Sequence, residues 1–492
     1  MENLTEENIR IIFGIKVKKL RSDMKLSLQQ LSARSGISIS YLNEIENGKK
    51  YPKTDKINEL SKALNTSYDQ LVSLKLNKNL APVGQFLNLD VINDFLFETF
   101  GIDKGTLLNM VANEPIRVSA FINSIFEIAR NYNLKQEHFF FLCLRSYQEL
   151  NDNYFEDIEE AVTNFIRETG FNNTPAVPAS EYEQVLKDKY SYLIQPTDFA
   201  DYPKLKQLRS VTIRNGRTTL LCNKKLTDQQ KAFLFGREVG FSCLKIDKRP
   251  NTTPWLKVDS FDQVLNNFRA SYFAQALHIN KELFIKDIEL FFESPKFSPE
   301  ALIKLLDKYS ASPEMLLTRI TNILPRYFGI NELFFIRYSS KEPEKNLKEI
   351  SKELHLSSQS ANFEYTISEQ TYRRWITKSL LKYMLEQKQN EKTKIEAVIS
   401  ENGNGNEYLT ISILRPMTEL NNNNNSVTIG FVLTPSVRKK IKFLDDLTLS
   451  ISKLGDLSKN EFEAPLELRK MKEQKEKEAE LEKLIESASL NR

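Results

Sequence analysis

The sequence predicts a mainly α-helical chain with a smaller α+β part, divided among several domains. Apolar residues recur at every third or fourth position through residues 6–74 and 84–170, which is typical of amphipathic helices. Further along, β-rich arms flank Asn215-Gly216, a dipeptide that strongly favours a β-hairpin. The chain has 492 residues. One core seldom serves more than about 250–300 residues, so we expect two to four domains.

The composition predicts a folded cytoplasmic protein. Hydrophobic residues make up 40% of the chain, which is enough for packed cores and argues against global disorder. The formal net charge of +4 is too balanced to indicate a polyanion-binding protein by itself. We find no run of about 18 apolar residues and no signal-peptide pattern, so no membrane partner is expected.

Cysteine and histidine usage predicts neither a disulfide framework nor a metal site. The three cysteines are odd in number and widely spread, and we interpret them as small apolar core residues. The three histidines lack metal-ligand spacing, so no structural metal and no cofactor is expected. These residues are Cys143, Cys222, Cys243, His138, His278 and His355.

The predicted elements follow in order along the chain. Residues 6–74 are expected to form five short helices, residues 84–170 remain helical, and prolines at 172–180 mark a linker. After the hairpin at 205–222, helices are predicted over 227–245, 260–278, 282–292, 299–308 and 312–324. A β segment is predicted at 332–338, and residues 393–436 alternate strand-like runs with the polar loops "ENGNGN" and "NNNNN". The last 30 residues are expected to form a charged, solvated helix.

The stretch "LSLQQLSARSGISISYLNEIENGKKYPKT" at 26–54 carries the strongest functional signal. Gly36 can take the left-handed backbone that a tight helix-to-helix turn needs, and Ser38 can cap the second helix. Leu42 and Ile45 face inward at helical spacing. Two helices joined in this way suit insertion of the second into a DNA major groove. The outward residues of that helix are Ile39, Ser40, Asn43, Glu44 and Asn47, and Lys49, Lys50, Lys53 and Lys56 follow where phosphates would flank it.

Residues 9–74 resemble the XRE family of helix-turn-helix DNA-binding domains, and "GISISYLNEIENGKKYPKT" is the specific part of the match. The resemblance implies a five-helix, lambda-repressor-like domain that binds double-stranded DNA. Arg21 and Glu46 occupy the positions of a buried ion pair in relatives. By the same resemblance, Gln29 would contact phosphate; Ser38, Ile39, Ser40, Asn43 and Glu44 would approach bases; and Asn47, Lys49 and Lys50 would anchor the backbone.

A helical interaction module with a solvated lysine face is the simpler alternative for this stretch. The glycine turn, the capping residue and the core spacing all agree with the DNA-binding interpretation, which we therefore prefer. Glu44 repels phosphate and can contribute only by accepting a hydrogen bond from a cytosine amine.

The segment "LTDQQKAFLFGREVGFSCL" resembles the metal-binding helix of ImmA/IrrE-type metallopeptidase domains. Zinc requires oxygen, imidazole or thiolate ligands, but Arg237 and Phe241 stand at the two histidine positions. A third ligand would precede the phrase "FRASYFAQALHI" (268–279), and Arg269 stands near that place. The resemblance therefore implies a degenerate α+β domain that is not an enzyme, in which Glu238 has no metal-bound water to deprotonate.

The phrase "SPEMLLTRITNIL…FGINELFFIRY" (312–338) resembles the segment that follows the peptidase-like domain in the short-chain fatty acyl-CoA regulator family. That resemblance implies sensing of an acyl-CoA or a related metabolite through residues 180–460. The cysteine cluster common near the end of that family is absent, so no metal or redox role is expected for the tail. An acyl-CoA needs an apolar slot and cations for its phosphates. We place Arg237 and Arg269 first, because the related scaffold puts both in one cleft; the full set of candidate cations is Arg209, Arg214, Arg217, Arg237, Arg269, Arg319 and Arg326.

Five segments result from this reading. They are a helix-turn-helix domain at 6–76, a helical linker or dimerisation region at 84–171, the ImmA/IrrE-like domain at 180–325, a carboxy-terminal α+β sensor-like domain at 326–460 and a charged helix at 461–492. The predicted function is a sequence-specific transcriptional regulator controlled by a metabolite. It is expected to be a homodimer or larger, because such domains bind two half-sites about one DNA turn apart. The alternatives are a metal-dependent protease acting on a partner repressor, and a regulator whose sensor domain binds another protein.

Overall fold

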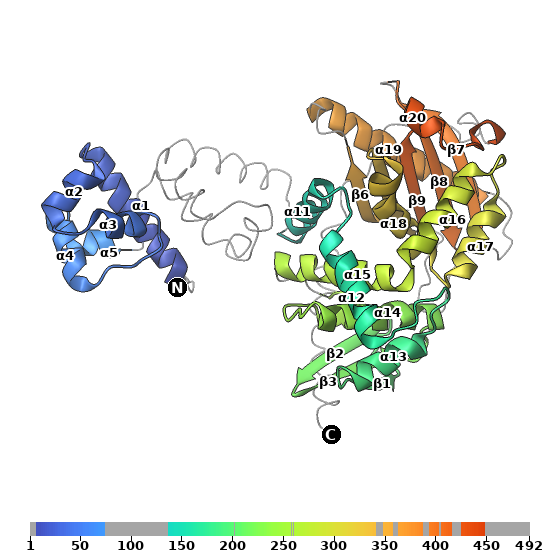
Figure 1. Cartoon of the computed structure of the whole chain (residues 1–492), viewed down its shortest axis with the longest axis horizontal. Helices are drawn as coiled ribbons and strands as arrows, with labels where there is room; N and C mark the ends of the chain where they lie inside the picture. Colours follow the sequence, from blue (N-terminus) through green and yellow to red (C-terminus); the bar gives the residue numbers. More distant parts are fainter. Residues whose placement is uncertain are drawn as a thin grey trace. The chain divides into compact units, whose positions relative to one another are not determined.

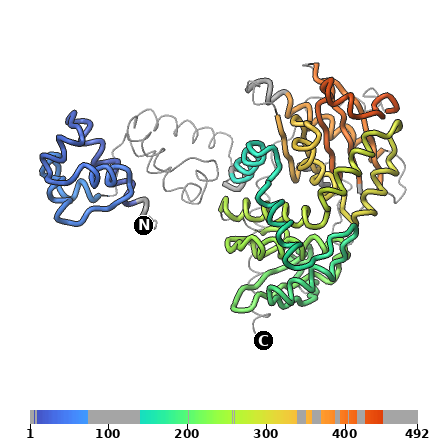
Figure 2. Tube along the Cα trace, in the orientation of Figure 1, coloured from blue at the N-terminus to red at the C-terminus, as the bar shows by residue number. Residues whose placement is uncertain are grey.

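The structure is a computed structural model, and its course along the chain is drawn in Figures 1 and 2. It describes residues 6–73, 136–200, 202–256, 258, 260–340, 348–357, 363–386, 393–402, 405–415 and 425–447. The chain divides into two compact units, one made of residues 1–143 with 259–262 and the other of residues 144–258 with 263–492.

The amino-terminal residues form a five-helix domain, as predicted. Its apolar core gathers side chains from all five helices, among them Phe13, Leu31, Leu42, Leu60 and Leu71. The two short helices in its middle begin at serine caps, which their polar amino-terminal sequences favour. The helices are α1 (Glu6–Asp23), α2 (Leu28–Ser35), α3 (Ile39–Glu46), α4 (Thr54–Ala63) and α5 (Tyr68–Val72).

The second unit contains a four-stranded sheet covered by helices on one face. The strand order is β1-β3-β2-β4; β1 runs parallel to β3, and the other pairs are antiparallel. The Asn215-Gly216 signal is confirmed, since β2 and β3 form a hairpin in which Gly216 has φ +78°. Leu220 and Cys222 pack on the helical side with Phe235 and Phe273. The elements are α11 (Gln136–Leu150), α12 (Glu156–Thr169), α13 (Ala179–Asp188), β1 (Leu193–Thr197), β2 (Ser210–Asn215), β3 (Arg217–Asn223), α14 (Asp228–Cys243), β4 (Thr252–Thr253) and α15 (Phe261–His278).

A five-stranded antiparallel sheet follows, with the order β6-β5-β9-β8-β7. Helices α16, α17 and α18 cover one face, where Leu409, Ile411 and Ile413 point into a large apolar core. Helix α19 covers the other face through Ile376 and Leu380. The elements are α16 (Lys281–Glu293), α17 (Pro299–Lys308), α18 (Pro313–Ile323), a π-helical turn (Leu324–Phe328), β5 (Leu333–Ser340), β6 (Lys348–Leu356), α19 (Phe363–Glu386), β7 (Lys394–Glu401), β8 (Glu407–Arg415), β9 (Asn425–Val432), α20 (Pro435–Arg438) and a 3₁₀ turn (Leu444–Asp446).

The predicted helices of the second unit are confirmed by α11, α12 and α14 to α18, and the β segments by β5, β7, β8 and β9. The sequence analysis missed α13, β1, β6 and α19. The sequence of β6, "KEISKELHL", has more charged than apolar residues, and its pairing with β5 rather than its own pattern defines it as a strand. The predicted helical stretch at 84–135 and the terminal charged helix lie outside the described residues.

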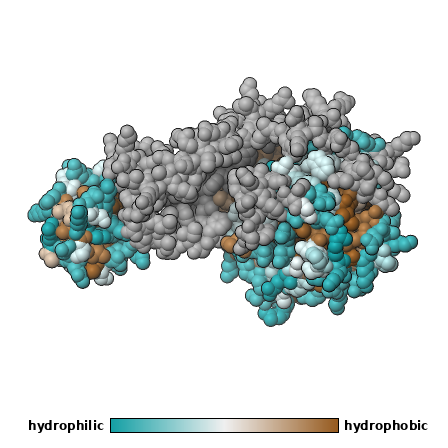
Figure 3. Space-filling model, turned by 90° about the horizontal axis from the view of Figure 1, so that it is seen from above, coloured by the Kyte–Doolittle hydropathy of each residue, from teal (hydrophilic) through white to brown (hydrophobic). Residues whose placement is uncertain are grey.

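Figure 3 shows that hydrophilic residues prevail on the visible surface of the described parts, with hydrophobic residues gathered in local patches. Within those parts, no helix has both the length and the apolar character needed to cross a bilayer.

Candidate nucleic-acid interface and the peptidase-like helix

Helices α2 and α3 form a tight helix-turn-helix. The Ser27 hydroxyl accepts from the Gln30 backbone N–H, and the Gln30 side chain accepts from the Ser27 N–H, so both ends of this capping box are made. Gly36 ends α2 at φ +67° and donates its N–H to the Ser32 carbonyl at 2.9 Å. Ser38 then caps α3 by accepting from the Tyr41 N–H at 3.3 Å. The turn residues singled out in the sequence therefore make the backbone bonds expected of them.

Arg21 and Glu46 hold α3 against α1. The Arg21 Nε lies 2.6 Å from Glu46 Oε1, and its Nη2 lies 2.8 Å from Oε2, which is a bidentate pair. Arg21 also donates to the Leu26 carbonyl at 2.8 Å. Hydrogen bonding to Glu46 raises the pKa of Arg21. The ion pair expected from the family resemblance is confirmed, and it fixes the orientation of α3.

Gly14 lets α1 and α3 approach each other closely. A Cβ at this position would lie 2.3 Å from the Ile45 carbonyl oxygen and 3.1 Å from that of Glu46. The backbone at the end of α3 therefore rests directly on α1, and only glycine fits there.

Most of the predicted DNA-contacting residues of this domain are accessible to solvent. Eight of the ten are exposed, and Glu44 and Asn47 are half-buried. Ile39 is 45% exposed at the first turn of α3, which is unusual for so large an apolar side chain and suits contact with a thymine methyl group. The ten are Gln29, Ser38, Ile39, Ser40, Asn43, Glu44, Asn47, Lys49, Lys50 and Lys53.

Asn47 has a partner within α3 that the sequence analysis did not foresee. Its Nδ2 donates to the carbonyl oxygen of Asn43 at 2.8 Å and to Asn43 Oδ1 at 2.9 Å. The oxygen of the Asn43 amide is therefore occupied, and its N–H donors face away from Asn47.

The peptidase-like helix α14 presents a different arrangement, in which Glu238 is buried and paired. The Glu238 carboxylate is 2% exposed, accepts from Arg249 Nη1 at 2.7 Å and accepts from the Tyr192 hydroxyl at 3.2 Å. Arg249 Nη2 in turn donates to the Tyr192 oxygen at 3.0 Å. Burial alone would lower the pKa of Arg249, but Glu238 and Tyr192 outweigh it and raise that pKa. The glutamate that would be a catalytic base in a peptidase is held in an internal ion pair here.

The Phe241 ring lies close to two guanidinium groups, those of Arg237 and Arg249. The Phe241 ring centroid lies 5.8 Å from the Arg237 guanidinium and 4.6 Å from that of Arg249. Arg237 donates to Thr253 Oγ1 and, at 3.4 Å, to Asn267 Oδ1. Burial, reinforced by the charges of Arg209 and Arg249, lowers the pKa of Arg237 to about 10, so it remains a cation at neutral pH. The donor set therefore does not fit zinc.

Arg269 and Arg237 have separate partners. Arg269 Nη2 forms an ion pair with Asp157 at 2.8 Å, whereas Arg237 contacts Thr253 and Asn267. Arg319, another candidate cation, is fully buried and bidentate on Glu159 at 2.5 and 3.1 Å. Within the described ranges, no group of three or more histidine, cysteine or acidic residues could hold a metal ion.

The isolated cysteines and histidines lie in packed surroundings. Burial raises the pKa of Cys143 to about 12 and that of Cys222 to about 11, which leaves both as thiols. His278 Nδ1 lies 2.9 Å from the Tyr182 hydroxyl within the helical core. The side chain of His138 lies outside the described residues.

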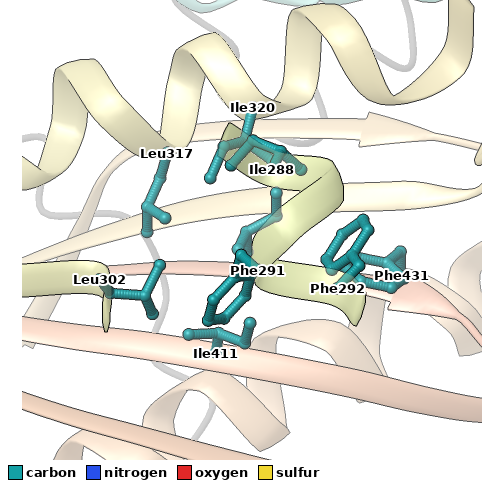
Figure 4. Close-up of a pocket in the computed structure, with 9 residues that line it drawn as sticks. Ile288, Phe291, Phe292, Leu302, Leu317, Ile320, Ile411 and Phe431 are labelled. Carbon is teal, nitrogen blue, oxygen red and sulfur yellow. The ribbon is translucent and has the colours of Figure 1, made fainter. Parts of the chain in front are cut away.

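One apolar cavity lies between helices α16, α17, α18 and the five-stranded sheet (Figure 4). Its volume is about 10 Å³, and Phe291, Leu317, Ile411 and Phe431 are among its lining residues. The cavity has room for about one water molecule. An acyl chain could enter only if these side chains moved apart.

The part of the chain that matches a known protein family is the amino-terminal domain, which contains α3. The helix-turn-helix family matches residues 17–71, from the middle of α1 to the end of α5. Together with the relatives below, this shows that the chain belongs to the helix-turn-helix family of transcriptional regulators, of the XRE type.

The proteins to which the chain is similar include two HTH-type regulators and one transcriptional regulator of known structure. RghR, an HTH-type transcriptional repressor of Bacillus subtilis (strain 168), is 39% identical over 61 residues, which are 12% of this chain and 45% of that protein. The HTH-type transcriptional regulator y4dJ of Sinorhizobium fredii (strain NBRC 101917 / NGR234) is 33% identical over 66 residues, which are 13% of this chain and 86% of that protein. A Mycobacterium tuberculosis transcriptional regulator of known structure has 16% identity and a TM-score of 0.40, over 60% of this chain and 81% of that chain. The chain thus spans about half the length of RghR.

Proposed function

We propose that this protein is a cytoplasmic transcriptional regulator that binds specific sites on double-stranded DNA through α3. The observation that carries the proposal is the accessible face of α3, on which Ile39, Ser40 and Asn43 are exposed while the Arg21–Glu46 pair fixes the helix from behind. A rigid helix with short polar tips and an apolar tip suits readout of base edges in the major groove. The exposed lysines Lys49, Lys50 and Lys53 follow directly and suit phosphate contacts.

The test begins with sequencing of genomic fragments bound by the purified full-length protein, which supplies an operator. Gel shifts then compare wild type with the double variant Ser40→Ala/Asn43→Ala. We expect affinity for the operator to fall by about tenfold or more, and affinity for unrelated DNA to change little. Lys308→Ala, which removes an exposed lysine paired with Asp287 in the second unit, is the matched control. Unchanged operator binding by the double variant would reject the assignment of this face.

We further propose that α14 is non-catalytic and that its domain resembles ImmA/IrrE peptidases in fold only. The support is chemical: a guanidinium and a phenyl ring stand at two ligand positions, and the remaining acid is paired with Arg249. Metal analysis of protein purified without chelators tests the proposal. About one tightly held zinc per chain would overturn it and would favour the alternative of a protease acting on a partner repressor.

Control by an anionic metabolite such as an acyl-CoA, with Arg237 as one of its contacts, completes the proposed function. The observation that favours it is that Arg237 is deeply buried and touches only uncharged partners through hydrogen bonds. Titration calorimetry with a series of acyl-CoAs, followed by operator affinity with and without each compound, tests this control. No heat and unaltered affinity would favour a sensor domain that binds another protein, which a pull-down without added small molecules can detect.

The regulator is proposed to act as a homodimer or larger, since two half-sites need two copies of α3. Light scattering of the full-length chain measures the oligomeric state directly. A monomer both free and bound to operator would contradict this part of the proposal.

A further inference from the structure

Arg237 is an unusual buried cation. Its side chain comes from the middle of α14, is 7% exposed and takes part in no ion pair of the described residues. The nearby acid Glu238 is committed to Arg249 and Tyr192. The Nε of Arg237 is buried without a hydrogen-bond partner. Burying a cation without a counter-charge is costly, and binding of an external anion would offset that cost.

A second unsatisfied polar group lies on the same side of the four-stranded sheet. The Ser210 hydroxyl is buried without a hydrogen-bond partner. Ser210 is paired across the β2–β4 ladder with Thr253, whose hydroxyl oxygen accepts from Arg237. Directly opposite residues of an antiparallel pair project to the same face, and Ser210 is also opposite Cys222, which packs toward α14. Ser210, Thr253 and Arg237 therefore meet in the layer between the sheet and α14.

Arg209 adds a further cation beside this layer. Its backbone N–H donates to the Thr253 carbonyl, and its guanidinium interacts with Glu314, which is itself paired with Arg337 and Lys352. The charged groups that act on Arg237 are Glu238, Arg209 and Arg249. Positive charge therefore exceeds negative charge around Arg237, also when Glu314 and its two partners are included.

We propose that Arg237, Ser210, Thr253 and Arg209 form a binding site for the doubly charged phosphate group of a small molecule. All four side chains can donate hydrogen bonds, as phosphate oxygens require, and the guanidinium groups match their geometry. The excess of positive charge favours a phosphate dianion over a single carboxylate. A backbone phosphate of duplex DNA cannot reach a side chain as deeply buried as Arg237, so the ligand is a small molecule.

This site differs from the pair predicted from the sequence. Arg269 has its own carboxylate partner, Asp157, and is not part of it. Only the biological use of the site depends on the metabolite control proposed above, because the phosphate ligand is inferred from the unsatisfied side chains themselves.

Thermal unfolding of the full-length protein in inorganic phosphate, in acetate and in chloride of equal ionic strength tests the proposal. At phosphate concentrations about ten times the dissociation constant, we expect the unfolding transition of the second unit to rise by roughly 2 °C relative to chloride. Acetate should raise it by less. An equal rise in acetate would overturn the assignment to phosphate, and no rise in phosphate would overturn the site.

Arg237→Met should abolish the response to phosphate. Because the variant removes an uncompensated buried cation, its transition in chloride should be at or above that of wild type. Ser210→Ala should weaken phosphate binding by about three- to tenfold without unfolding the sheet, so it carries the test even where Arg237→Met fails to fold. Arg167→Met, at an exposed arginine of α12 that contacts Asn164, is the matched control and should respond as wild type does. A full phosphate response in Arg237→Met or in Ser210→Ala would place the anion elsewhere.

Fluorescence anisotropy with labelled operator separates the site from its proposed use. Phosphate at matched ionic strength should change operator affinity in wild type and not in Ser210→Ala, if the site controls DNA binding. A phosphate-dependent thermal shift with unaltered operator affinity would leave the binding site in place and reject the metabolite control proposed above.

Discussion

Helices α3 and α14 both carry residues that the sequence analysis singled out for a function, yet the two helices place those residues differently. On α3, Ile39, Ser40 and Asn43 are exposed, and Glu44 is half-buried. On α14, Arg237, Glu238 and Phe241 are all buried and contact the interior. The surface of α3 is available to an external macromolecule, whereas these three side chains of α14 are part of the interior. Similarity to a functional motif therefore indicates a function only once the exposure of each motif residue is known.

The largest effect is expected at the ion pair of α14. Glu238→Gln leaves Arg249 buried without its counter-charge, and removal of one partner of a buried pair costs on the order of 3–5 kcal/mol. We expect a corresponding loss in the free energy of unfolding of the second unit, measured by chemical denaturation. The double variant Glu238→Gln/Arg249→Met removes both charges and should recover much of the loss.

That pair of variants also distinguishes a structural from a catalytic glutamate. A catalytic acid in an open cleft can be replaced with little change in stability. If Glu238→Gln unfolds within about 0.5 kcal/mol of wild type, the internal role of Glu238 and the contrast with α3 are both wrong.

A smaller effect is expected where α3 rests on α1. Gly14→Ala introduces a methyl group 2.3 Å from the Ile45 carbonyl oxygen, so the two helices must separate. We expect a loss of about 1–3 kcal/mol in the stability of the helix-turn-helix domain, together with weaker operator binding. Hydrogen exchange of residues 6–73 measures the domain directly. Ser22→Ala, at an exposed position of the same helix, should leave exchange unchanged, and equal behaviour of the two variants would contradict the close approach.

The sequence predicted the amino-terminal domain almost completely because its determinants are local. Capping residues, the Gly36 turn and the apolar spacing all lie within about 30 residues of one another, and the structure confirms each. The Arg21–Glu46 pair joins residues 25 positions apart, and the family resemblance supplied it.

The surroundings of α14 could be predicted only in part, because they depend on contacts between distant segments. The sequence showed that Arg237 and Phe241 are residue types that do not bind zinc. Nothing in it indicated that Arg249, from the loop after α14, would form an ion pair with Glu238. The Glu159–Arg319 pair joins residues 160 positions apart. The sequence alone therefore could not show that Arg319 already has a carboxylate partner. The unsatisfied hydroxyl of Ser210 is likewise visible only once β2 and β4 are paired.

The lysines after α3 provide a graded test of the exposed surface. Lys49→Ala/Lys50→Ala removes two exposed cations, and each phosphate contact contributes roughly 0.9 to the slope of log K against log salt concentration. We expect the slope to decrease by roughly 1.8 for operator and unrelated DNA alike, because phosphate contacts carry no sequence information. Lys308→Ala in the second unit should keep the wild-type slope. A loss confined to the operator would show that these lysines read bases.

The smallest effect, and the one that resolves α3 most finely, is expected at Asn47. The family resemblance makes Asn47 a contact to the DNA backbone, whereas the structure places its Nδ2 on both oxygens of Asn43. In that arrangement Asn47 orients the Asn43 amide so that its N–H donors point outward, toward acceptors such as guanine O6 and N7 or thymine O4. Asn47→Ala should then reduce the ratio of operator to unrelated-DNA affinity by about three- to tenfold, the worth of one hydrogen bond, while binding to unrelated DNA stays close to wild type. Anisotropy with both duplexes at one salt concentration measures the ratio. An equal loss for both duplexes would instead make Asn47 a phosphate contact, and α3 would then read bases without an internal constraint on Asn43.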